Sequence, residues 1–133
     1  MGEEILVEGQ VADTIKFVNK LGDLGIRTSF AVWYYYDDLE DWRLLIAGPD
    51  FDEILSGKPD AAYKNVVDAM KQADVSSISI SDVKLVKTTD PLPQAIRRVL
   101  TTSESGFSRA HFTNNYIDGV FLKDIVVLRS AIT

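Results

Sequence analysis

The sequence predicts an α+β fold, with a mainly antiparallel sheet that includes an N-terminal aromatic hairpin and packs against about three helices. Three observations predict it: an aromatic and aliphatic run between residues 30 and 47, three segments with apolar residues at helical spacing, and a β-rich run from residue 120. The chain of 133 residues has no internal repeat or linker, so we expect one domain spanning residues 1–133.

The first helix is predicted over about residues 9 to 22. Its apolar stripe consists of Val11, Ile15, Val18 and Leu21. Glu8 and Asp13 near its start suit the helix dipole, and Gly22 and Gly25 end it.

An aromatic hairpin is predicted next, with strands at residues 29–36 and 42–47 joined by an acidic loop. If Asp37 pairs with Trp42, strand alternation divides the side chains between two faces. One face, expected to be core, carries Trp33, Tyr35, Trp42, Leu44 and Ile46. The other face, expected to be half covered, carries Phe30, Val32, Tyr34, Tyr36, Arg43 and Leu45.

The middle of the chain is predicted to hold two helices with a strand between them. Residues 49–57 are expected to form a loop, and Pro59 suits the first turn of a helix over residues 59–73. Alternating apolar residues between Ile78 and Val86 predict a strand. Asp90 as N-cap and Pro91 at the first helical position predict a third helix over residues 91–102.

The last part of the sequence returns to β-strand patterns. Residues 107–112 form a weak strand signal, and residues 120–132 form a long one. Two dipeptides between them, Asn114-Asn115 and Asp118-Gly119, are typical of turns. The charged pair Lys123-Asp124 interrupts the long run and indicates either a bulge or a change of edge.

Composition narrows the possible functions. With no cysteine and one histidine, we expect no disulfide, no zinc site and no cofactor, and we favour a protein that is not an enzyme. A net charge of −6 makes binding to nucleic acid unlikely on charge grounds, since phosphate contacts rely on Lys and Arg. No apolar run is long enough to cross a membrane, and the acidic start does not resemble an export signal, so we expect a cytoplasmic protein.

One alternative assigns the chain a chemical role. Arg109 and His111 alternate on the weak strand, so they would point to the same face, near Arg97, Arg98 or Lys123. Such a site could act as a metal-independent nuclease, with His as acid or base and Arg facing the phosphate. The opposite interpretation is an exposed strand face with a hydrogen-bonded His, and we favour it.

The acidic, aromatic hairpin favours a protein that binds another protein. We place the hypothetical interface on its second face and the adjoining acidic loop. It comprises Tyr34, Tyr36, Asp37, Asp38, Glu40, Asp41 and Arg43. Two versions stay open: an acidic inhibitor or immunity-type protein that docks onto a basic toxin or nuclease, and self-association as a homodimer. If a helix of the chain covers this face, Tyr34 and Tyr36 are core instead.

Four short strings carry a family resemblance: WRLLIAGP at residues 42–49, Ala62-Tyr63, Asp90-Pro91-Leu92, and GVFLKDI at residues 119–125. Together they resemble a group of small uncharacterised bacterial α+β proteins. The resemblance implies a bacterial, single-domain, cytoplasmic protein. It implies no activity, cofactor or functional residue.

Overall fold

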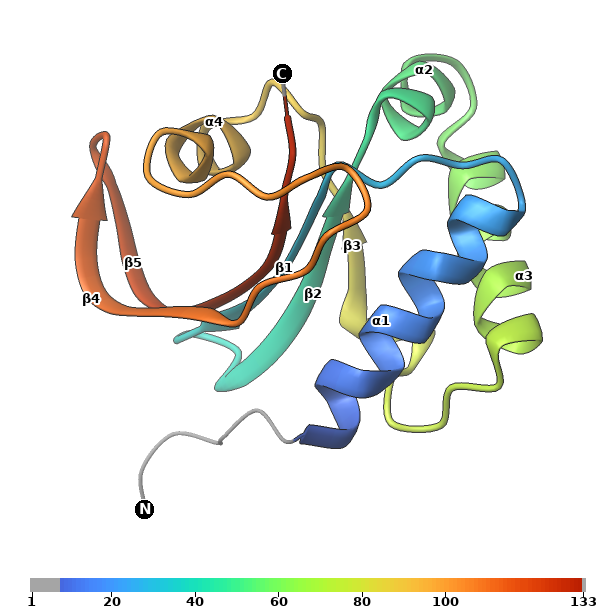
Figure 1. Cartoon of the computed structure of the whole chain (residues 1–133), viewed down its shortest axis with the longest axis horizontal. Coiled ribbons are helices and arrows are strands. Elements are labelled where there is room, and N and C mark those ends of the chain that lie inside the picture. Colours follow the sequence, from blue (N-terminus) through green and yellow to red (C-terminus); the bar gives the residue numbers. More distant parts are fainter. Residues whose placement is uncertain (1–7, 133) are drawn as a thin grey trace.

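The computed structural model describes residues 8–132 and contains a five-stranded open sheet with helices against both faces (Figure 1). The strands lie in the order β3-β2-β1-β5-β4, and every neighbouring pair is antiparallel except β2 and β3. The strands are β1 (Phe30–Tyr36), β2 (Asp41–Ala47), β3 (Val83–Leu85), β4 (Ala110–Ile117) and β5 (Val120–Ser130). The predicted α+β class is therefore confirmed.

Helix α1 (Glu8–Asp23) covers one face of the sheet together with α3 (Pro59–Ala73), as the right half of Figure 1 shows. Its buried stripe includes Phe17 and Leu21, which belong to the same core cluster as Trp33 of β1. Trp33 is completely buried, and its indole Nε1 donates a 2.9 Å hydrogen bond to Thr14 Oγ1. A buried indole N–H needs such a partner, so Thr14 makes the large ring compatible with this core.

The other face packs against α4 (Pro91–Arg97), whose fully buried Ile96 lies in one cluster with Phe30, Val32 and Leu45. This helix is shorter than the predicted 91–102. After Arg97 the backbone N–H groups of Val99 and Leu100 both donate to Ile96 O, which forms one further turn. Thr102 N then donates to Ser130 O on β5. A hydrogen bond to the end of β5 therefore replaces the last predicted helical turn.

The hairpin formed by β1 and β2 differs from the predicted one by two residues in register. Trp33 pairs with Leu44, and Tyr36 with Asp41, so Asp37 does not pair with Trp42. Because side chains alternate with a period of two, a slip of two leaves every residue on its predicted face. Accordingly Trp33 and Leu44 lie in the cluster under α1, and Val32 and Leu45 lie in the cluster under α4.

Residues 49–57 form a helix, α2 (Pro49–Gly57), where a loop was predicted. Pro49 occupies its first turn and Phe51 is buried, but a helix this short offers too few apolar repeats to be recognised. The residue before this helix, Gly48, lies so close to the backbone of Arg27 that no side chain fits there. A Cβ at this position would lie 2.0 Å from the backbone oxygen of Arg27. The strand predicted up to Val86 is also shorter, since a 3-10 turn, η1 (Ile80–Asp82), precedes β3.

Strands β4 and β5 form a long hairpin that bends around the side of the sheet where α4 lies (Figure 1). Its turn is Asp118-Gly119, as predicted, whereas Asn114-Asn115 lies within β4 and is not a turn. Asn114 nevertheless has a left-handed φ of 49°. In the paired strand β5, the alternation of side chains between the two faces is interrupted nearby. Leu122 and Ile125 both lie in the α4 cluster although they are three positions apart. This irregularity lies at the predicted Lys123-Asp124 interruption.

Candidate functional site

Four of the seven residues predicted for the interface line a hollow beside α4, whereas Glu40, Asp41 and Arg43 are not among its lining residues. The hollow has a volume of about 370 Å³, and we call it the tyrosine hollow. Its lining comprises Tyr34, Tyr35, Tyr36, Asp37, Asp38, Leu92, Val120, Phe121 and Lys123. The sequence thus identified four of the lining residues, Tyr34, Tyr36, Asp37 and Asp38, while the contributions of α4 and β5 depend on tertiary structure.

Tyr34 and Tyr36 are half-buried, and their ring centroids lie 4.9 Å apart. Burial raises the pKa of the Tyr34 hydroxyl, which makes a long 3.4 Å hydrogen bond to the backbone oxygen of Phe121. Leu92 is the residue of α4 that lines the hollow. The short helix therefore covers these rings in part, and they belong neither to the closed core nor to a fully exposed surface.

Aromatic surface continues from the hollow to the tip of the β4–β5 hairpin. Tyr116 is 76% exposed and Phe121 is 42% exposed, and their ring centroids lie 4.9 Å apart. Since Phe121 also lines the hollow, the exposed pair and the tyrosines form one continuous surface. Contiguous exposed apolar area of this kind is typical of binding sites.

The acidic loop borders the hollow, and some of its charges are already paired. Asp37 accepts a 2.5 Å hydrogen bond from Lys123 Nζ, and Asp41 pairs with Arg43 at 2.8 Å. Asp38 and Glu40 form no ion pair with any residue between 8 and 132. Arg43, which pairs with Tyr34 across the strands, also donates to the backbone oxygen of Trp42, so its guanidinium is held near the loop.

The basic residues proposed for a phosphate or RNA site are paired with different carboxylates of the chain. Arg109 forms a 2.6 Å ion pair with Glu8 of α1, and His111 Nε2 contacts Asp124 Oδ1 across the β4–β5 pair. Arg98 pairs instead with Asp118 at the turn of that hairpin, at 3.1 Å. A phosphate would have to displace these carboxylates. Within residues 8–132, no group of three or more Asp, Glu or His side chains is arranged to hold a metal ion.

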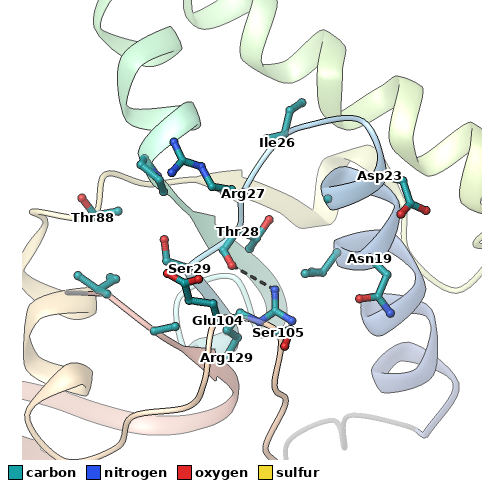
Figure 2. A pocket seen from close by; sticks show the side chains of 15 residues that line it. Asn19, Asp23, Ile26, Arg27, Thr28, Ser29, Thr88, Glu104, Ser105 and Arg129 are labelled. Atoms are coloured by element: carbon teal, nitrogen blue, oxygen red, sulfur yellow. Dashed lines mark hydrogen bonds between the residues drawn. The ribbon is translucent and has the colours of Figure 1, made fainter.

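A second cavity lies between the C-terminal half of α1, the α1–β1 loop and the loop around Ser105 (Figure 2). Its volume is about 540 Å³, and Arg129 of β5 lies in its wall. Sequence reasoning missed this residue, although a signal was present. Arg129 is the only charged residue between Ile125 and Ile132, and an arginine within such an apolar strand is often buried for a reason.

Comparison of the chain with protein-family models, with curated proteins and with solved structures finds no match. In the part of the chain that the structure describes, no helix has the length and apolar character needed to cross a membrane. The two cavities and the residues around them are the features of the chain that bear on its function.

Proposed function

We propose that this chain is a cytoplasmic bacterial protein that binds a partner protein through the tyrosine hollow, and that the partner presents a basic surface. The observation that carries the proposal is the placement of Tyr34 and Tyr36, whose rings contact each other, beside Asp37 and Asp38 in one open hollow. Aromatic side chains in pockets, bordered by polar residues, are the usual anchors of protein interfaces.

The half-buried state of the tyrosines favours tight binding. A side chain that is already held by its neighbours loses little conformational freedom when a partner covers it. Tyr34 is held by the ring of Tyr36 and by Phe121, and Leu92 packs in the same cluster. The exposed Tyr116–Phe121 pair adds area next to this anchor.

Charge supports a basic partner. The chain carries −6 overall. Asp38 lines the hollow and Glu40 lies in the same loop, and neither has an ion-pair partner among residues 8–132. The rings of this region also lie near cations of the chain itself, since Lys84 Nζ lies 5.6 Å from the centroid of Tyr36. A lysine or arginine of the partner could use the same ring faces and the free carboxylates. A basic toxin or nuclease that is held inactive by this protein is one partner of this kind.

The test begins with capture of partners from a bacterial extract on the immobilised protein, followed by kinetic binding measurements on the purified captured protein. We expect Tyr36→Ala to weaken binding by at least about tenfold, because interface anchors contribute about 2 kcal/mol or more. The matched control is Leu24→Ala, which removes an apolar side chain of 42% exposure beyond the end of α1. A partner that binds both variants like the wild type would contradict the proposal.

The acidic loop gives a second, independent readout. Changing Asp38 to Asn and Glu40 to Gln should lower the association rate and reduce its dependence on salt, with little effect on dissociation. Equal association rates in the wild type and in this double variant would exclude a basic partner at this site. If no protein is captured and sedimentation shows a dimer that Tyr34→Ala converts to monomers, self-association replaces the proposal.

A further inference from the structure

Arg129 is a buried cation whose surroundings are made almost entirely of neutral groups. The residue is 6% exposed, and its guanidinium lies over the ring of Phe107, 4.2 Å from the centroid. Nε donates to the backbone oxygen of Gly106 at 3.0 Å, and Nη1 donates to that of Thr28 at 3.2 Å. A guanidinium has five N–H donors in a planar fork, so these two bonds leave donors available.

No carboxylate of the described chain, residues 8–132, pairs with this guanidinium. Burial without a counter-charge lowers the pKa of Arg129, a sign that the protein environment disfavours its charged form. Arginine stays protonated in proteins, so the cost of the buried charge is carried by the folded state. Such a cost is expected where the charge is needed to meet a charge of opposite sign.

The space next to Arg129 has room for such a group. Arg129 and Thr28 lie in the wall of the 540 Å³ cavity, and Figure 2 shows Asn19 and Asp23 of α1 on one side of them and Thr88 on the other. Thr28 is itself buried, and its Oγ1 has no hydrogen-bond partner among the described residues. A buried hydroxyl without a hydrogen-bond partner, beside a buried cation without a carboxylate partner among residues 8–132, is a second, independent sign of a ligand site.

The other arginine of this cavity behaves differently. Arg27 is held by Asp50 through two side-chain hydrogen bonds, at 3.0 and 2.9 Å, and its own backbone N–H also donates to that carboxylate. Its charge is therefore balanced within the chain. Of the two arginines in the wall, Arg129 is the one available to a ligand.

We propose that this cavity binds a small organic anion, with a single carboxylate or phosphate group on Arg129 and a polar body in the space beyond. Asn19, Ser29 and Ser105 line that space and offer hydrogen bonds. Asp23 and Glu104 line it as well, so a ligand with several negative charges, such as a nucleoside triphosphate or a nucleic acid, is excluded by repulsion.

The test follows the protein by NMR during titration with sodium phosphate and, separately, with sodium acetate, against sodium chloride at equal ionic strength. We expect saturable shifts of the Arg129 Nε–H signal and of the backbone amides around Thr28 and Gly106, which chloride does not produce. The probe that saturates at the lower concentration identifies the acidic group of the ligand. Absence of saturable shifts with both probes overturns the proposal, and this result needs no variant.

Two variants then separate binding from support of the loops. Arg129→Met removes the charge and keeps most of the side-chain volume. We expect it to lower the affinity for the more tightly bound probe by at least about tenfold, because hydrogen bonds to charged groups are stronger than those between neutral groups. Arg97→Met is the matched control, because Arg97 is exposed on α4 and outside the cavity. Equal probe affinity in the Arg129→Met variant and in the control overturns the proposal.

Unfolding of the same variants in the absence of probe gives a further discriminating result. A buried charge kept for a ligand predicts that Arg129→Met leaves the unfolding midpoint unchanged or raised. A large loss of stability together with unchanged probe binding by the folded fraction would identify Arg129 as a structural clamp and overturn the proposal.

Discussion

The two faces of the sheet are built from the same strands but are covered by helices to different extents. On one face, α1 with 16 residues and α3 with 15 residues close the core over Trp33, which has no exposed surface. On the other face, α4 has 7 residues and leaves the next residue of the same strand, Tyr34, half-buried. Strand alternation decides the face on which an aromatic ring lies, and the extent of the helical cover on that face decides whether the ring becomes core or surface.

The difference in cover also explains why the aromatic rings of the proposed site are partly exposed. Tyr34 and Tyr36 have the composition of a core, and they remain available to a partner because α4 contributes Leu92 alone to the hollow. Substitutions on the two faces should therefore differ in a graded way.

The largest expected effect is that of Trp33→Ala, which should lower the free energy of unfolding by about 3–5 kcal/mol. It leaves a large cavity under α1 and removes the hydrogen bond to Thr14. Tyr34→Ala, one residue along the strand, should cost only about 1–2 kcal/mol because the ring is half covered. Urea denaturation followed by circular dichroism measures both, and equal losses would place Tyr34 in the core and break the comparison.

Within α4, Ile96→Ala should cost about 2–4 kcal/mol, since this side chain is fully buried against Phe30, Val32 and Leu45. Leu92→Ala, one turn earlier and at the edge of the hollow, should cost about 1 kcal/mol. The pair measures where the cover provided by α4 ends. A larger loss for Leu92→Ala than for Ile96→Ala would show that the hollow is closed.

Hydrogen bonds on the two faces should follow the same order. Thr14→Val leaves the buried indole N–H of Trp33 without its acceptor and should cost about 1–3 kcal/mol. Tyr34→Phe removes a long bond at an open site and should change stability by less than about 0.5 kcal/mol. Thermal unfolding resolves the difference, and a loss for Tyr34→Phe equal to that for Thr14→Val would contradict it.

The smallest effect is a dependence on pH from two carboxylates that anchor elements on the α1 side. A hydrogen bond from the Ser77 hydroxyl lowers the pKa of Asp13, and hydrogen bonds from the Arg27 side chain lower that of Asp50. Because both values are depressed in the folded state, the stabilisation is present above the usual value of 3.8 and is lost as the pH falls through the folded pKa. Asp13→Asn should reduce the slope of the unfolding free energy against pH between pH 4 and about pH 2, as measured by urea denaturation at each pH. An unchanged slope in this variant would show that Asp13 contributes nothing there.

Much of the fold could be predicted because it depends on local pattern. The helix boundaries of α1 and α3 follow from apolar periodicity together with Gly22 and Pro59, and the faces of Trp33 and Tyr34 follow from strand alternation. The register of the hairpin does not, since a slip of two residues preserves the alternation and is decided by the geometry of the loop at Glu40, whose φ is 50°. Helix α2 was not predicted, because its single buried residue, Phe51, does not define an apolar stripe.

The site was predictable only in part, for a related reason. Tyr34, Tyr36 and the acidic loop are neighbours along the chain, so their association can be inferred from the sequence. Leu92 and Phe121 reach the hollow from distant segments, and the environment of Arg129 is built from residues around positions 28 and 106. Such contacts become visible only when the sheet order is known.

The central position of β1 has a consequence for the way the chain acquires its structure. One edge of β1 pairs with the nearby β2, but the other pairs with β5, so that Phe30 meets Ser130 and Tyr34 meets Ile125. During synthesis β1 and β2 therefore leave the ribosome long before the strand that completes the sheet. Pairings between such distant segments slow folding, and an apolar strand with an unpaired edge is prone to aggregation in the meantime. Newly made chains should thus depend on chaperones until residues 120–130 have emerged.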